Sequence, residues 1–361
     1  MKTGRIGYAE GIALTAISLF INGLFSADSR TAYANGNSTY LSIPLAVMLS
    51  LILTMLLMNA SKNDENLPEL MRRGTGRIGA AILSLPIAAA FVLAAAKPLV
   101  GFAEVLHRLV FDGVSYWAIL LYVFPVTVFI AWKGFESLGR LALIFSGLIL
   151  ASVVIAAVSA SPEFDSSRLY PLLGTGPKEF LSFTASETLF LLPPLIAAHI
   201  NLKGLNGREQ ARKIAVISAL LAALLVGLTQ LALGLIFPYK VLAGLLLPLY
   251  RINFLSLSQS YVLRLDKLFI MVWLTGSVIS SAYLIFSASL LVTSAFGARN
   301  NTPAVLALSF AVLAVMSVGF TAELGAADAL LRFETGPAPL LAVLPLLLAA
   351  VLSVMKRRER K

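Results

Sequence analysis

The sequence predicts an all-α integral membrane protein with ten transmembrane helices. Of its 361 residues, 58% are hydrophobic and only 13% are charged, against roughly 45–50% and 25% in an ordinary soluble domain. The apolar residues also form runs longer than ~18 residues, the length at which a helix crosses a bilayer. These observations exclude a soluble globular protein and leave no room for a separate catalytic domain.

The apolar runs fall into two sets of five. The outer segment 159–178, which is rich in Pro and Gly, separates the sets. We therefore expect one transmembrane domain over residues 1–361, with a first five-helix repeat at 1–160 and a second at 161–361. The predicted spans lie at 8–34, 40–58, 78–100, 114–132, 139–158, 177–201, 211–237, 266–296, 302–321 and 338–355.

Two connections have a predicted form. The polar segment 59–76 is expected to be a helix-turn connection on the inner side, because acidic residues precede Arg72 and Arg73 in it. The mildly apolar run 245–261 is too broken to span, since it contains Pro248, and it is expected to form an outer lid or re-entrant segment.

The basic residues predict the orientation. Cytoplasmic loops of membrane proteins carry an excess of Lys and Arg, and with the amino terminus inside, every predicted inner segment is basic. A cleaved signal peptide at the start would leave nine spans and put the basic tail on the wrong side for most loop charges. We therefore expect both termini in the cytoplasm. The residues assigned to the inner side are Lys2, Arg5, Lys62, Arg72, Arg73, Arg77, Lys133, Arg140, Lys203, Arg208, Arg212, Lys213, Arg299, Lys356, Arg357, Arg358, Arg360 and Lys361.

Composition also excludes several kinds of chemistry. The absence of Cys rules out disulfides, iron–sulfur clusters and thiol nucleophiles, and two His residues make a multi-His metal site improbable. We expect no metal and no cofactor. The net charge of +10 maps onto the inner loops, so it indicates orientation in an anionic membrane and not nucleic-acid binding. An intramembrane enzyme has little support, because the spans contain no paired-carboxylate, Ser-Lys or metal-ligand constellation.

The first span of each set carries a predicted break. In transporters built from inverted repeats, unwound backbone in these two helices binds ions and charged substrates. Asn22 and Gly23, both poor helix formers, interrupt the first span. In the sixth, Pro193 and Pro194 remove two amide donors. Each feature alone is more often a packing detail, but their matching positions in the two halves favour a binding site.

Glu187 is the sharpest single candidate. An ionisable group deep within a span is costly and by default marks a pathway, a proton site or a substrate partner. At mid-depth Glu187 would bind and release a proton or hold a substrate ammonium, and the sequence does not choose between these roles. The alternative is a shallow position near the outer water, because Lys178 and Glu179 lie about two helical turns above it.

The predicted binding site joins the two breaks to a polar stripe on the eighth span. Small hydroxyl residues there also serve simply to pack helices closely, so the stripe alone is ambiguous. The expected substrate-binding residues are Ile21, Asn22, Gly23, Leu24, Ser186, Glu187, Phe190, Ser277 and Ser281.

Four short motifs are distinctive: 134–136 with Arg140, 170–176, Phe183 with Glu187, and 264–266 with Trp273. Together they resemble the B-subunit permease of the nutrient germinant receptors of endospore-forming bacteria, a branch of the amino acid-polyamine-organocation superfamily. The resemblance covers most of the chain, although each motif is short and degenerate. One departure is the sequence 24–27 after the first break, where family members usually carry a proline.

The resemblance implies a fold and a function. The implied fold is the LeuT-like five-plus-five inverted repeat with discontinuous first and sixth helices, and a small nutrient such as an amino acid would bind between the first, third, sixth and eighth spans. The implied role is a receptor subunit of the spore inner membrane or cell membrane that works with an A-type membrane subunit and a C-type lipoprotein. The alternative is a secondary transporter that moves an amino acid or polyamine with a proton through the same site.

Overall fold

The computed structural model describes residues 4–26, 36–62, 65–111, 113–244, 265–298, 300–321 and 338–358. These ranges are predominantly helical and contain no strand, and each of the ten predicted spans overlaps one long helix in them. Those helices are α1 (Tyr8–Leu24), α3 (Thr39–Ala60), α4 (Leu67–Val105), α5 (Tyr116–Lys133), α6 (Phe135–Ala160), α7 (Pro177–Ile200), α8 (Arg208–Ile236), α11 (Leu265–Phe296), α12 (Thr302–Thr321) and α14 (Ala338–Arg358).

Length and composition make the chain a multi-pass membrane protein. A helix satisfies its own backbone hydrogen bonds, which is why apolar segments cross the hydrocarbon core in this form. Within the described ranges, seven helices are long and apolar enough to span, and three shorter apolar helices accompany them. The seven are Gly36–Ala60, Leu67–Val105, Tyr116–Lys133, Phe135–Glu163, Pro177–Ile200, Arg208–Ile236 and Phe269–Phe296, and the three are Tyr8–Leu24, Thr302–Ser317 and Val343–Met355.

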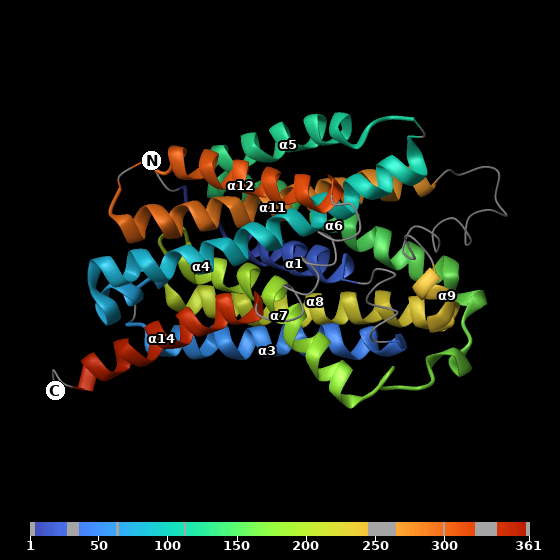
Figure 1. The fold of residues 1–361 in the computed structure, drawn as a ribbon, viewed down its shortest axis with the longest axis horizontal. Helices are drawn as coiled ribbons and strands as arrows, with labels where there is room; N and C mark the ends of the chain where they lie inside the picture. The colour runs from blue at the N-terminus through green and yellow to red at the C-terminus, as the bar shows by residue number, and fades with distance from the viewer. Residues whose placement is uncertain are drawn as a thin grey trace.

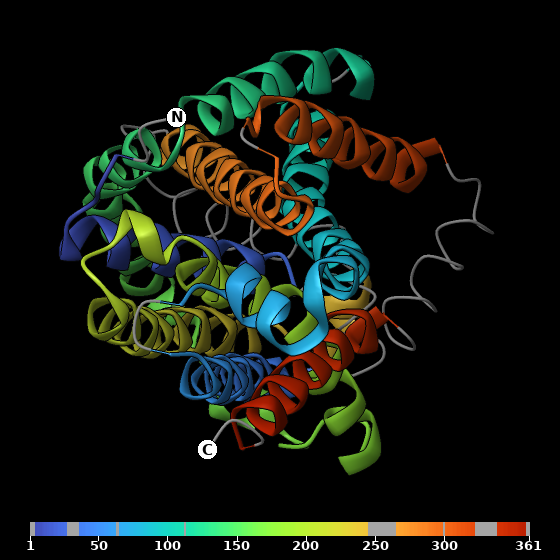
Figure 2. The same ribbon diagram turned by 90° about the vertical axis from the view of Figure 1, so that its left-hand side faces the viewer.

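The helices lie lengthwise beside one another, and both termini are at the same end of the bundle (Figure 1). Viewed along the bundle, α5 and α12 form one edge and α3 and α14 the opposite edge (Figure 2). Helices α1, α7 and α11 are largely buried, whereas α5 and α6 expose large apolar side chains such as Leu121 and Ile144. Exposed apolar side chains on outer helices are expected where lipid is the solvent. The three buried helices therefore form the interior of the bundle.

The connections predicted to lie inside come together at one end. Lys203 Nζ, after α7, lies 2.5 Å from Glu69 Oε1, and the Ile6 amide donates to the carbonyl of Gly204 at 3.0 Å. Arg208, at the start of α8, donates to the carbonyl of Ser61 after α3 at 3.2 Å. This grouping is the one that the predicted topology requires. The orientation of this end in a membrane remains a prediction.

The segment between α3 and the spanning part of α4 is the helix-turn connection that the sequence predicts. Asn66 caps α4: its side chain accepts from the Glu69 amide at 3.1 Å, and the Glu69 carboxylate accepts from the Asn66 amide at 3.1 Å, a reciprocal capping box. The helix is then interrupted at Gly76, whose φ of 77° and ψ of −176° are not helical. Backbone of this kind is essentially restricted to glycine. A short helix, 67–75, thus precedes the spanning part of α4.

Arginines on either side of Gly76 bind the ends of other helices. Arg72 and Arg77 donate to the carbonyls of Ala295 at 3.3 Å and Phe296 at 3.1 Å, at the end of α11. Arg73 donates to the carbonyl of Ala60 at 2.8 Å, at the end of α3. The last carbonyls of a helix have no partner within it and carry a partial negative charge. These arginines therefore supply the missing donors.

Two expectations about broken helices have different outcomes. The first helix does end at the predicted place, because α1 stops at Leu24, directly after Asn22 and Gly23. The expected second part of that span, from 27 onward, and the lid or re-entrant segment at 245–261 lie outside the described residues. The expectation of a discontinuous sixth helix is wrong, since α7 runs without interruption from Pro177 to Ile200.

Candidate functional site

Glu187 lies near the middle of α7 and is buried. Ten residues separate it from Pro177 at the start of the helix and thirteen from Ile200 at its end, which places it ~15 Å along the helix at 1.5 Å per residue. Its side chain is only 5% exposed. The carboxylate is therefore shielded from water and needs a partner inside the bundle. The depth of Glu187 in a membrane remains a prediction.

That partner is Lys97 on α4. The Lys97 ammonium lies 3.0 Å from Glu187 Oε2 and 3.3 Å from Oε1. A cation and an anion buried together avoid the cost that either would incur alone. Sequence reasoning missed Lys97, although the rule that singled out Glu187 applies equally to a lysine inside the third predicted span.

Two further residues complete the site. Ser26, just beyond the end of α1, hydrogen-bonds to the Glu187 carboxylate and also accepts from the Lys97 ammonium at 2.8 Å. The Phe190 ring, one turn along α7 from Glu187, has its centroid 3.9 Å from Lys97 Nζ, a cation–π distance. We call Ser26, Lys97, Glu187 and Phe190 the ammonium cluster. Three helical segments, α1, α4 and α7, thus meet around one positive charge.

Asn22 connects this cluster to the end of α1. Its carbonyl accepts from the Ser26 hydroxyl at 3.0 Å, and its side-chain amide donates to Ser280 on α11 at 3.1 Å. Ser280 also hydrogen-bonds Ser18 on α1 at 2.9 Å. The Asn22 Oδ1 atom is buried without a hydrogen-bond partner among the described residues. The predicted residue Asn22 is therefore part of a polar contact between α1 and α11.

The predicted serines on α11 lie on buried surfaces, with different partners. Ser281 donates to the carbonyl of Ala95 on α4 at 2.7 Å, two residues before Lys97. Ser277 is buried, and its hydroxyl has no hydrogen-bond partner among the described residues. Ser186, the remaining predicted serine, donates to the Ser182 carbonyl of its own helix at 3.0 Å. Ser281 thus links α11 to the backbone that presents Lys97.

The other predicted residues of α1 are packed tightly. A methyl group on Gly23 would lie 3.0 Å from Val226 Cγ2 and 3.2 Å from Ile43 Cγ2, so a larger residue would force these neighbours to move. Ile21 and Leu24 are fully buried. Ile21 fills the space left by Gly276, where an added methyl would meet Ile21 Cδ1 at 2.7 Å. These three residues set how closely α1 approaches α8 and α11.

The two prolines of α7 remove hydrogen-bond donors without ending the helix. A proline has no N–H, so the carbonyls of Leu189 and Phe190 lack the helical donors that positions 193 and 194 would otherwise supply. One of these two carbonyls belongs to Phe190, a member of the ammonium cluster. The prolines therefore remove two donors from α7, but the predicted break of this helix is absent, because its backbone stays helical throughout.

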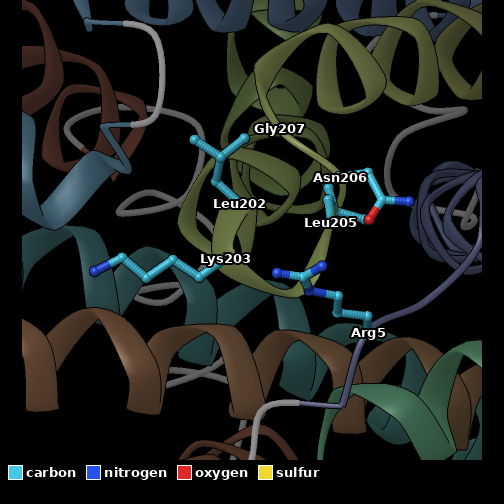
Figure 3. Close-up of a pocket in the computed structure, with 6 residues that line it drawn as sticks. All are labelled: Arg5, Leu202, Lys203, Leu205, Asn206 and Gly207. Carbon is cyan, nitrogen blue, oxygen red and sulfur yellow. The ribbon is translucent and has the colours of Figure 1, made fainter.

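A separate pocket of about 520 Å³ lies at connections that the sequence predicts to be on the inner side. It is formed where the segment before α1 meets the connection between α7 and α8 (Figure 3). Sequence reasoning did not assign it a role. Its lining residues are Arg5, Leu202, Lys203, Leu205, Asn206 and Gly207.

The chemistry of the ammonium cluster is recognition of charge. A carboxylate, a hydroxyl and an aromatic face surround one ammonium group, and no group of three or more potential ligands in the described residues is placed to hold a metal ion. Such a site can bind a cation or exchange it for another.

Comparison with solved structures finds transporters. MHP1, a nucleobase-cation-symport-1 family transporter in a closed conformation with bromovinylhydantoin bound, superposes with a TM-score of 0.64 at 14% identity, over 97% of this chain and 91% of that one. A Na⁺-coupled sialic acid symporter in a substrate-bound outward-open state gives 0.64 at 12% identity, over 95% and 79%. The manganese transporter of Eremococcus coleocola gives 0.61 at 15%, over 98% and 79%. The chain thus has the LeuT-like fold of these transporters.

The sequence itself identifies the family. No curated protein matches the chain. The profile described as spore germination protein, a spore permease, matches residues 6–323, a range that includes the ammonium cluster. Both the family and the structural neighbours are permeases and transporters, not enzymes. The chain belongs to the spore germination protein family, the permease family of the germinant-receptor B subunits.

Proposed function

We propose that this protein is the membrane subunit of a nutrient germinant receptor, which binds a small nutrient such as an amino acid and signals spore germination. The observation that carries the proposal is the buried pair of Lys97 and Glu187 beside the end of α1. Ionisable groups inside a membrane domain are by default functional. Family membership supports the germination role, and the fold supports a site between α1, α4, α7 and α11.

Ligand binding would act by shifting a conformational equilibrium. An amino acid carries an ammonium and a carboxylate, and the ammonium cluster offers one group of each opposite charge. A ligand that binds one arrangement of α1 and α7 better than another increases the population of that arrangement. Partner subunits, expected to be an A-type membrane protein and a C-type lipoprotein, would detect the change. In this proposal both termini lie in the cytoplasm, the membrane is the spore inner membrane or the cell membrane, and residues 1–160 and 161–361 form the two repeats.

The test measures germination and ligand binding in Glu187→Gln and Gly23→Leu variants whose expression has been confirmed. The first removes the negative charge of the cluster, and the second overfills the contact with Val226. We expect both variants to lose the nutrient response. Matched controls are Glu179→Gln, an exposed carboxylate on the same helix, and Gly147→Leu, a helical glycine with open space around it. Normal germination in both test variants would remove this site from consideration.

The second candidate function is a proton-coupled transporter of an amino acid or polyamine. It draws support from the structural neighbours, two of which are described as a symporter or a member of a symport family. Uptake of labelled substrate into proteoliposomes under a pH gradient separates the two functions. Saturable accumulation that Glu187→Gln abolishes would contradict a pure receptor, and binding without accumulation would contradict the transporter.

A further inference from the structure

Lys97 occupies a place that would suit any primary ammonium. Its Nζ lies 2.8 Å from the Ser26 hydroxyl, 3.0 Å from a Glu187 carboxylate oxygen and 3.9 Å from the centroid of the Phe190 ring. A carboxylate, a hydroxyl and an aromatic face are also what a protein uses to bind the amine of a small molecule. These contacts recognise the ammonium and not the four-carbon stem that attaches it to α4.

The occupant of this place must be a cation. Glu187 is 5% exposed, and a buried carboxylate that loses its counter-ion bears a large desolvation cost. If the Lys97 ammonium leaves, the cheapest replacement is another ammonium with the same three contacts. The departing Lys97, on its flexible stem, in turn needs an anion. Exchange with a ligand that carries both an amine and an anionic group keeps both charges paired.

We infer that Ser26, Glu187 and Phe190 form a binding site for the primary ammonium group of a ligand, and that Lys97 fills it as a tethered competitor in this structure. This inference rests on the proposed binding site and adds what occupies that site before a ligand binds. A short tether gives the Lys97 ammonium an effective concentration on the order of millimolar. A ligand must therefore exceed a threshold before it displaces Lys97.

The test uses the full chain, purified in detergent, and the variant Lys97→Ala. This substitution removes three carbons and the ammonium, so n-propylammonium replaces the lost atoms and n-propanol is the matched neutral control. We expect Lys97→Ala to unfold at a lower temperature than the wild type. Its Tm should rise saturably with n-propylammonium, by at least about 3 °C, and not with n-propanol. Wild-type protein should need at least about tenfold more amine for a half-maximal shift.

The double variant Lys97→Ala with Glu187→Gln tests whether the carboxylate is the receiving group. The Tm of this double variant should rise no more with n-propylammonium than with n-propanol. Equal effects of amine and alcohol on Lys97→Ala, or amine rescue of the double variant, would overturn the inference. If Lys97→Ala is not recovered folded, the yield of monodisperse protein solubilised with amine or with alcohol gives the same comparison, and equal yields overturn it.

These outcomes are independent of germination. Amine rescue in purified protein, combined with a normal nutrient response of Glu187→Gln spores, would remove the receptor proposal and leave the ammonium site standing. A lost nutrient response of Glu187→Gln spores without amine rescue in purified protein would remove the ammonium site and leave the receptor proposal standing.

Discussion

The Lys97 ammonium on α4 lies 3.0 Å from the Glu187 carboxylate on α7, and the two side chains are only 17% and 5% exposed. Ninety residues separate them in the sequence. The pair joins two helices at the point where α1 ends, so its charge state affects three elements of the interior together.

Removing one charge of the pair should be worse than removing both. Glu187→Gln leaves Lys97 as a buried, uncompensated cation, and we expect a loss of about 3 kcal/mol in the free energy of unfolding. The double variant Lys97→Met with Glu187→Met should recover most of this loss, because it leaves no unpaired charge. Thermal or denaturant unfolding in detergent compares the stability of both variants with that of the wild type. As a control, Lys213→Met breaks an exposed pair with Glu209 and should leave the Tm unchanged. A double variant less stable than Glu187→Gln would contradict the prediction.

The aromatic face of Phe190 should contribute only while Lys97 is present. Phe190→Leu removes the ring that lies 3.9 Å from Nζ, and the expected cost beyond packing is about 0.5–2 kcal/mol. Phe190→Tyr keeps the ring and should keep this contribution. In a Lys97→Met background the difference between Leu and Tyr at position 190 should shrink by this contribution and leave only the packing difference. A double-mutant cycle on the unfolding free energy measures this coupling, and an unchanged difference would show that the ring acts by packing alone.

The contact between α1 and α8 should make Gly23 intolerant of even a methyl group. A helical Gly→Ala change ordinarily gains up to about 1 kcal/mol, but at Gly23 the added carbon lies 3.0 Å from Val226 and overpacking costs about 1–3 kcal/mol. We expect Gly23→Ala to lower the Tm and Val226→Ala to compensate in the double variant. Gly147→Ala, with no atom within 4 Å, is the matched control and should be neutral or stabilising. Equal changes in Tm for Gly23→Ala and Gly147→Ala would disprove the packing argument.

The interruption of α4 at Gly76 should depend on backbone conformation alone. A methyl group there would meet no atom within 4 Å, yet φ is 77° and ψ is −176°. We expect Gly76→Ala to cost about 1–3 kcal/mol of stability, and truncation of neighbouring side chains should not restore it. The measurement is the unfolding midpoint of Gly76→Ala, compared with that of Gly147→Ala, because Gly147 has a helical φ. No loss in Gly76→Ala would mean that the connection adopts a second conformation at little cost.

The positions of the helices were predictable because hydrophobic run length is a local property. The end of α1 was also predictable, since Asn22 and Gly23 weaken a helix wherever they occur. The continuity of α7 was not. Proline removes a donor in every context, but whether the backbone stays helical depends on packing around it, and Pro44 and Pro125 likewise lie inside continuous helices.

The candidate site was half predictable. Glu187 stood out because it is ionisable within an apolar span, and Lys97 has the same property, so both could be nominated from the sequence. That they pair with each other depends on the crossing of α4 and α7, which no local pattern encodes. Ser26 carries no signal of its own among many serines, and only the end of α1 brings it to the two charges.

The two missing donors of α7 lie between two contacts that this helix makes with other parts of the bundle. A helix that lacks two consecutive hydrogen bonds resists bending less at that point than elsewhere. The weak point begins two residues after Glu187, so the carboxylate lies in the part of α7 that starts at Pro177. His199, whose Nε2 lies 3.1 Å from the carbonyl oxygen of Glu65, lies in the part that ends at Ile200. The least stiff turn of α7 therefore joins the part that holds the charge pair to the part that contacts the connection after α3.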